Sequence, residues 1–183
     1  MMRISRILQP LFRGIAVTLV LGCLSLAQVA TAQAAGVAQV EILSPKDVTA
    51  LMPHSVFFRG QTASVQLRNT YGLRLADGTM VLAGLVDNSG YATGIQQKYQ
   101  GYLLSEIGLA IGGKKLPAGA YGFGFVANET FIVMDLGAHQ VLKVTSKADP
   151  SLARPRPLTI VAGGEPGSYR LYEGRRYVSV QLK

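Results

Sequence analysis

The sequence predicts an all-β protein, either a β-sandwich or a small barrel of about ten short antiparallel strands. Short apolar or alternating segments recur from residue 37 to residue 182. Turn residues separate these segments at intervals of roughly 8–12 residues, which is typical of sandwiches and barrels. The segment from Gly112 to Phe125 combines a turn and a strand, and it is the clearest local pattern in the chain.

Within this central segment, Pro117 suits the second position of a tight turn, and Gly119 tolerates the positive φ that closes such a turn. Beyond the turn, three aromatic residues alternate with two glycines. Residues two apart in a strand share a face, so the aromatic residues are expected to enter the core. The glycine face is left bare, and another backbone, a partner or a ligand can approach it closely. The aromatic residues are Tyr121, Phe123 and Phe125, and the glycines are Gly122 and Gly124.

Before the central segment, alternation and apolar runs predict a first group of strands. We expect Asp77-Gly78 to form a hairpin turn. The run 80–86 is apolar on both faces, which is typical of a central strand covered on both sides. Residues 95–105 remain open between helix and strand, because helical spacing of apolar residues competes with several glycines. The expected strands in this part are 37–43, 55–59, 63–68, 71–76 and 80–86.

After residue 105 the same patterns predict a second group of strands. Asn128-Glu129 is expected to be a tight turn, and 147–157, with three prolines, a loop that crosses an edge. Turns are also expected at 163–167 and 174–176. The expected strands in this part are 107–111, 120–127, 130–136, 140–145, 158–162, 169–173 and 177–182.

The first 34 residues resemble a secretory signal peptide in layout. Three arginines precede the apolar stretch 15–30, and small-residue cleavage sites follow it, the second ending at Ala34. We therefore expect a signal peptide over 1–34, a single all-β domain over 35–183, and export to the periplasm or the cell exterior. A retained membrane anchor is the alternative, and lipidation of Cys23 is another. Cleavage after Ala34 would leave no cysteine, which excludes disulfides and thiolate chemistry.

Positive charge is concentrated at the end of the chain. Residues 35–142 hold seven cations and seven anions, whereas residues 143–183 hold eight cations and three anions. A basic end can meet anionic lipid, polysaccharide or nucleic acid. The alternative is a charged rim that keeps the protein soluble.

The C-terminal hairpin is the candidate binding site that the sequence offers. Arginines interleaved with tyrosines can hold an anionic polymer or a ring-bearing ligand. Alternatively, the tyrosines pack on the core while the arginines protect a sheet edge. The candidate residues are Arg170, Tyr172, Arg175, Arg176 and Tyr177.

Catalytic and metal-binding motifs are scarce in the sequence. There is no Gly-x-Ser-x-Gly motif, and His54 and His139 are the only imidazoles in the chain. Either could pair with a nearby acid in a hydrolase or a metal-dependent enzyme, but two histidines and scattered methionines do not define a site by spacing. We expect no metal ion and no cofactor.

The residues from Gly112 to Tyr121 form a Gly-Lys-x-Leu-Pro-Ala-Gly-x-Tyr pattern. This pattern resembles a recurring hairpin of small exported bacterial β-proteins of uncharacterised function. The segments 158–160 and 170–178 are similar to the end of such proteins, so the resemblance covers the second half of the chain. It implies a sandwich-like fold and an exported protein, and it assigns no catalytic residue.

These observations favour a non-catalytic, envelope-associated binding module whose partner is anionic lipid or polysaccharide; nucleic acid is not favoured. A small β-barrel carrying an apolar ligand is the first alternative, because the glycine face is bare and 49% of the residues are hydrophobic. An enzyme that uses His54 or His139 is the second.

Overall fold

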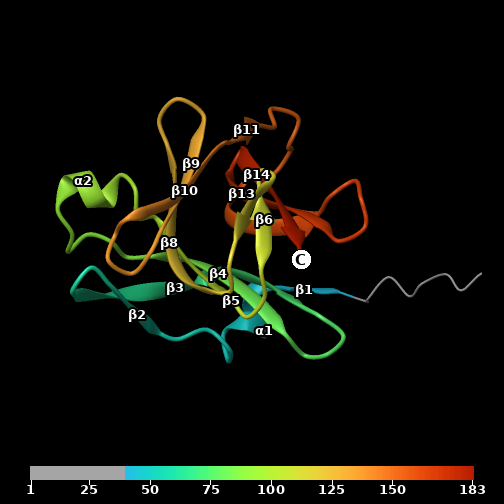
Figure 1. Cartoon of the computed structure of the whole chain (residues 1–183), viewed down its shortest axis with the longest axis horizontal. Coiled ribbons are helices and arrows are strands. Elements are labelled where there is room, and N and C mark those ends of the chain that lie inside the picture. Colours follow the sequence, from blue (N-terminus) through green and yellow to red (C-terminus); the bar gives the residue numbers. More distant parts are fainter. Residues whose placement is uncertain (1–39) are drawn as a thin grey trace, which may run out of the picture. The chain divides into compact units, whose positions relative to one another are not determined.

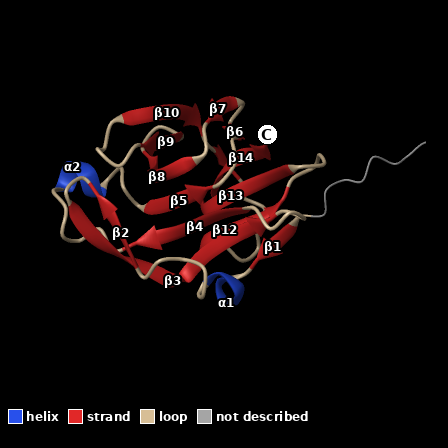
Figure 2. Cartoon of the chain, turned by 60° about the horizontal axis from the view of Figure 1, so that its bottom comes forward, coloured by secondary structure: helices blue, strands red, loops and turns tan. Residues whose placement is uncertain are grey.

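A computed structural model describes residues 40–183 of the chain, and these residues form two antiparallel β-sheets packed face to face (Figures 1 and 2). This arrangement confirms the prediction of an all-β sandwich-like fold. The predicted signal peptide, its cleavage site at Ala34 and the lipidation alternative at Cys23 lie outside the described residues. Within residues 40–183, no helix is both long and apolar enough to span a membrane.

The larger sheet has eight strands in the order β1-β3-β4-β5-β8-β9-β10, with β2 paired to β3 as a side hairpin. β4 lies in the middle of this sheet and is largely buried, as its apolar sequence predicts. The strands are β1 (Glu41–Leu43), β2 (Ser55–Phe58), β3 (Gln61–Arg74), β4 (Met80–Val86), β5 (Gly101–Ser105), β8 (Gly119–Val126), β9 (Thr130–Met134) and β10 (Gln140–Thr145).

The smaller sheet has six strands in the order β12-β13-β14-β6-β7, and β11 pairs with β14. The last three strands of the chain belong to this sheet, and they correspond to the strands predicted at 158–162, 169–173 and 177–182. The strands are β6 (Leu109–Ile111), β7 (Lys114–Leu116), β11 (Lys147–Ala148), β12 (Arg156–Ala162), β13 (Ser168–Gly174) and β14 (Arg176–Leu182).

The main core lies between the two sheets. Phe123 and Phe125 of β8 point into it with no more than 1% of their surface exposed, and Phe131 of β9 packs against both. The smaller sheet contributes alternate residues of β13 and β14, such as Leu171 and Val178. The predicted inward aromatic face of β8 is therefore confirmed for Phe123 and Phe125, while Tyr121 packs against this core and is only partly buried.

A second core covers the other face of the larger sheet. The chain itself provides the cover, through α1 (Pro45–Val48), β2, α2 (Thr93–Gln96) and the segment that follows α2. Figure 2 shows α1 beside β3 and α2 beyond the end of β2. Large aliphatic and aromatic side chains fill this layer, and Val48, Phe58 and Tyr99 are fully buried. The central strands of the larger sheet are thus buried on both faces, whereas β10 at its edge keeps exposed side chains.

Gly122 and Gly124 of β8, here named the glycine strip, face this second core. A Cβ atom at Gly122 would lie 2.6 Å from the Phe58 ring and 2.8 Å from the Tyr99 ring. A Cβ atom at Gly124 would lie 2.2 Å from the carbonyl oxygen of Lys98. The sequence left open whether another backbone, a partner or a ligand approaches the bare glycine face. The structure shows that the chain's own residues do so, and no space remains there for a ligand.

An aromatic cluster seals the glycine strip. The Phe58 and Tyr99 rings stack with their centroids 3.8 Å apart, and Tyr91 meets Tyr99 edge-on at 5.3 Å. The Tyr91 hydroxyl donates a hydrogen bond to the Phe58 carbonyl at 3.0 Å. Gln100 then extends the pairing of β8, because its side chain accepts from the Phe125 N–H at 2.6 Å and donates to the Phe125 carbonyl at 3.2 Å.

Several local predictions need correction. The segment 95–105, left open between helix and strand, divides into the end of α2 and strand β5, and Tyr99 between them packs against Phe58 and Tyr91. The two strands expected at 63–68 and 71–76 are one strand, β3, with an irregular register between Val65 and Thr70. The expected loop 147–157 contains β11 and the first residues of β12.

Candidate anion-binding groove

A hollow opens between the edge of the larger sheet and the middle of the smaller one. β10 is the last strand of the larger sheet. Opposite it, β6 pairs with β14 only from Val180 onward and β11 pairs with β14 only up to Tyr177, so Val178 and Ser179 border the space between them. The Gly112 N–H, just after β6, donates to the Ser179 carbonyl at 2.9 Å. The hollow has a volume of about 600 Å³.

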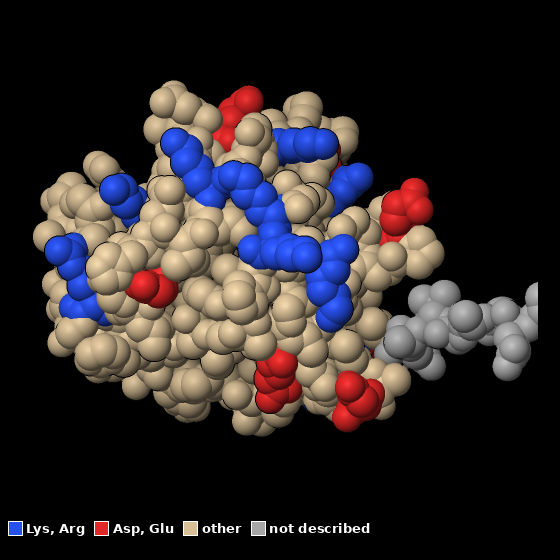
Figure 3. All heavy atoms as spheres, in the orientation of Figure 1, with Lys and Arg blue, Asp and Glu red and all other residues tan. Residues whose placement is uncertain are grey.

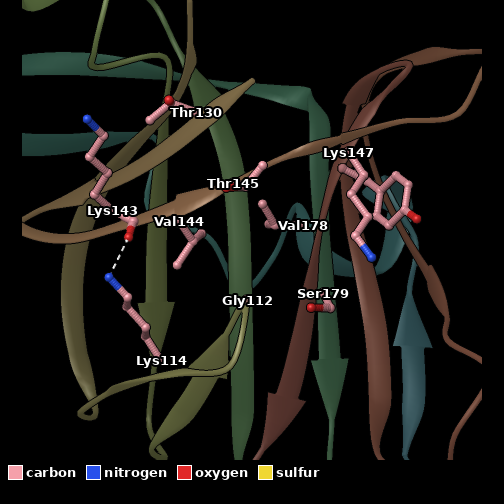
Figure 4. Close-up of a pocket in the computed structure, with 10 residues that line it drawn as sticks. Gly112, Lys114, Thr130, Lys143, Val144, Thr145, Lys147, Val178 and Ser179 are labelled. Carbon is pink, nitrogen blue, oxygen red and sulfur yellow. Dashed lines mark hydrogen bonds between the residues drawn. The ribbon is translucent and has the colours of Figure 1, made fainter. Parts of the chain in front are cut away.

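We name this hollow the lysine groove, because three lysines line it. Lys143 and Thr145 of β10 are exposed, while the intervening Val144 and the preceding Leu142 enter the main core. Because side chains alternate along β10, its polar side chains lie on the side that faces away from the main core. Figure 4 shows two of the lysines on one side of Gly112 and Val178 and the third on the other. The polar lining residues, apart from Tyr177, are Lys114, Lys143, Lys147, Thr130, Thr145 and Ser179.

Lys114 also protects the edge of the larger sheet. Its Nζ atom donates a hydrogen bond to the Lys143 carbonyl at 3.0 Å, drawn as a dashed line in Figure 4. A cationic side chain on an edge strand deters pairing with another strand. The same contact brings a second positive charge to the β10 side of the groove.

The groove carries positive charge without opposing carboxylates. No Asp or Glu is among its lining residues, and within residues 40–183 none of its three lysines forms an ion pair. Figure 3 shows Lys and Arg side chains gathered in a band across one face of the molecule, with most Asp and Glu side chains outside the band. Like charges lining one concave surface raise the local concentration of anions.

A second hollow of about 760 Å³ adjoins the lysine groove. The two hollows share Thr130 and Lys143. We name the second one the amide hollow, because four side-chain amides line it together with two further cations. These residues are Gln97, Gln100, Asn128, Gln140, Lys98 and Arg176.

Two arginines of the predicted C-terminal site hold the fold together. The Arg176 guanidinium donates to the Phe125 and Val126 carbonyls at 2.7 and 2.9 Å, so it ties the smaller sheet to β8. It also pairs with the Glu173 carboxylate at 3.2 Å. Burial raises the pKa of the Glu173 carboxyl, and Arg176 offsets this only in part. Arg175 donates to the Pro150 carbonyl at 2.9 Å and also to the Leu152 carbonyl, which fastens the loop before β12.

The other three predicted residues form a stacked cluster on the outer side of the smaller sheet. The Arg170 guanidinium lies 4.9 Å from the centre of the Tyr177 ring, and the Tyr172 and Tyr177 rings are 5.0 Å apart. The Tyr172 hydroxyl donates to the Asp149 carboxylate at 3.0 Å. Hydrogen bonds from Ser151 and then from Tyr172 lower the pKa of Asp149. Of the five predicted residues, Tyr177 lines the lysine groove and Arg176 lines the amide hollow.

The histidines lie apart from both hollows. His139 is 82% exposed, and its Nδ1 atom is 3.1 Å from the carboxylate of Asp135, which also accepts the N–H groups of Gly137 and His139. Asp135 therefore caps the turn between β9 and β10. His54 is exposed in the connection before β2. Among the described residues, no three His, Cys, Asp or Glu side chains come together as metal ligands.

The hollow inside the main core is too small for an apolar ligand. A hollow lined by Leu73, Leu103, Ile160 and other apolar side chains of the main core has a volume of about 20 Å³. A volume of this order holds about one water molecule, whereas pockets for small ligands measure roughly 300–1,000 Å³. The main core is therefore packed.

Comparison with known proteins finds no relative: no family model, no curated protein and no solved structure matches the chain. The assignment of a site therefore depends on geometry and charge alone. The sequence indicated an excess of cations from residue 143 onward but did not identify the lysine groove. Its residues come from three separate parts of the sequence, which are the β6–β7 turn with β7, the segment from β9 to β11, and β14, and they meet only in the folded protein.

Proposed function

We propose that the protein is a non-catalytic binding module of the cell envelope that holds an anionic ligand in the lysine groove. The observation that carries this proposal is the lining of the groove, which has three lysines and no carboxylate. Ammonium groups that form no ion pair within the described part of the chain remain available for acidic groups of a ligand. The hydroxyls of Thr130, Thr145 and Ser179 add hydrogen-bond donors and acceptors beside them.

The physical character of the groove sets the expected mode of binding. Lys143 and Lys147 are exposed, and each exposed ion pair contributes only about 0.2–1 kcal/mol. Several such contacts together give moderate affinity that falls with added salt, because charges in water are screened. The groove thus suits a ligand that presents several negative charges at once.

The test is charge reversal in the groove. The double variant Lys143→Glu, Lys147→Glu should lower affinity for polygalacturonate or for phosphatidylglycerol vesicles by at least about tenfold at low salt, because it replaces attraction with repulsion. Isothermal titration calorimetry and vesicle sedimentation measure the two cases. Arg175 and Arg176 are unsuitable targets, because their guanidinium groups bond backbone carbonyls and their reversal would disturb the fold.

The matched control is Lys46→Glu, Arg68→Glu, which makes the same change in net charge. Both residues are exposed and line neither hollow; Lys46 belongs to α1, which covers the opposite face of the larger sheet, and Arg68 to β3. The proposal requires the control to keep most of the wild-type affinity. Equal losses in the two variants, or no binding of either anionic probe by the wild type, would overturn it.

A further inference from the structure

The two hollows lie one after the other along β10. Gln140 lines the amide hollow, Lys143 lines both hollows, and Thr145 and Lys147 line the lysine groove. At a rise of about 3.3 Å per residue, β10 from Gln140 to Thr145 alone spans roughly 16 Å, and Lys147 lies beyond its end in β11. One acidic group cannot reach across this distance, whereas a linear polymer can.

Cations lie in both parts of this path. Lys114 and Lys147 line the lysine groove, Lys98 lines the amide hollow, and Lys143 stands between them; Arg176 also lines the amide hollow, but its charge is paired with Glu173. No Asp or Glu lines either hollow. The pattern of charge therefore matches a chain with repeated negative groups better than a ligand with a single one.

The amide hollow adds groups that recognise neutral hydroxyls. The side-chain amides of Gln97, Asn128 and Gln140 form no hydrogen bond to another part of residues 40–183, unlike Gln100, which is bonded to Phe125. Each amide offers two donors and an acceptor, which suits sugar hydroxyls. Of the apolar lining residues, Phe125 and Ile132 are only 1% and 4% exposed, so the apolar surface open to an acyl chain is limited to the half-buried Val126 and the exposed Ala127.

From these observations we infer that the ligand is a linear acidic polysaccharide that lies along β10 and occupies the lysine groove and the amide hollow together. This inference depends on the proposed function and specifies its ligand. The lysine groove and Lys143 hold acidic groups, while the amides and Lys98 contact the next sugar units.

The experiment compares the affinities of the protein for galacturonate oligomers of different length, measured by calorimetry at low salt. A dodecamer should bind about 100-fold more tightly than a trimer, because linked contacts on one surface reinforce each other. Lys98→Glu should weaken the dodecamer at least tenfold and leave the trimer within about twofold, because a short oligomer occupies the lysine groove alone. Lys147→Glu should weaken both.

The control is Lys115→Glu, a reversal on β7 that lines neither hollow. Its effect on dodecamer binding should be much smaller than that of Lys98→Glu. Unchanged dodecamer binding by Lys98→Glu would overturn the inference, because greater length alone adds statistical binding positions without using Lys98. Tighter binding to phosphatidylglycerol vesicles than to the dodecamer would also overturn it, and yet would leave the proposed function standing.

Discussion

The glycine strip of β8 and the lysine groove beside β10 are opposite solutions to the same problem of an incompletely covered sheet. The strip has no side chains of its own, and Phe58, Tyr99 and the Lys98 backbone cover it completely. The groove has many side chains of its own, and no part of residues 40–183 covers it. The glycine strip, which the sequence predicted to be bare, is covered in the folded protein. The lysine groove, which the sequence did not identify, is open to solvent.

The difference follows from what each surface costs to bury. A glycine lets aromatic rings approach the backbone, and close packing of apolar atoms is favourable. Covering lysine side chains would remove their charges from water without providing carboxylate partners, which is costly. A bare apolar strip therefore attracts the chain itself, whereas a cluster of like charges remains in solvent.

The largest expected effect is the loss of the ring that covers the glycine strip. Phe58→Ala should lower the free energy of unfolding by about 3–5 kcal/mol, because Phe58 is fully buried and its removal leaves a cavity against Tyr99 and Gly122. Urea denaturation measures the change. The neighbouring Phe57 is 56% exposed, so Phe57→Ala should cost less than about 1 kcal/mol. Similar losses for the two variants would contradict the closed strip.

The next effect is the addition of a single methyl group to the strip. Gly124→Ala should lower the free energy of unfolding by about 1–3 kcal/mol, because the new Cβ meets the Lys98 carbonyl and the backbone must shift. The control is Gly164→Ala, whose Cβ has no heavy atom within 4 Å and which should change stability by less than about 0.5 kcal/mol. Thermal unfolding of the two variants would distinguish a tight strip from a loose one.

In the groove, binding and stability should separate. Lys143→Ala, Lys147→Ala should change the free energy of unfolding by less than about 1 kcal/mol, because both side chains are exposed and form no ion pair among the described residues. The same variant should lose roughly tenfold in affinity for polygalacturonate, measured by calorimetry. A large loss of stability would show that the lysines hold the two sheets together and are not free to bind a ligand.

The smallest effect concerns the carboxylate that pairs with Arg176 at the amide hollow. Because burial raises the pKa of Glu173 above its unfolded value, ionisation costs more in the folded protein, and stability falls as the pH rises through this titration. Glu173→Gln removes this ionisation. Between about pH 4 and pH 7, the free energy of unfolding of the variant should therefore rise relative to that of the wild type by less than about 1 kcal/mol. Denaturation at several pH values measures the gain. An advantage that shrinks as the pH rises would refute this assignment.

The fold class could be predicted because it depends on local patterns. Alternation in β8, β10 and β14 and the turns at Asp77-Gly78 and Asn128-Glu129 indicate hairpins through short-range geometry alone. Residues 95–105 could not be assigned in the same way. Their structure depends on Tyr99 stacking on Phe58, a contact between residues 41 positions apart in the sequence.

The candidate site could likewise be predicted only in part. The sequence indicated a basic, tyrosine-rich C-terminal hairpin, but it could not distinguish arginines that bond carbonyls from lysines that remain in solvent. That distinction depends on where each side chain ends. Arg176 reaches β8 of the other sheet, while Lys143 remains at the open edge of β10.

By itself, the sequence determined the all-β class, most of the strands, the inward aromatic face of β8 and the excess of positive charge towards the C-terminus. The tertiary structure alone decided what covers the glycine strip and where the lysines from β7, β10 and β11 meet. It also decided which cationic side chains bond to the protein's own backbone. Strand patterns follow from the period of the backbone, which is local. The groove arises where strands of two sheets come together, and no local pattern records which strands those are.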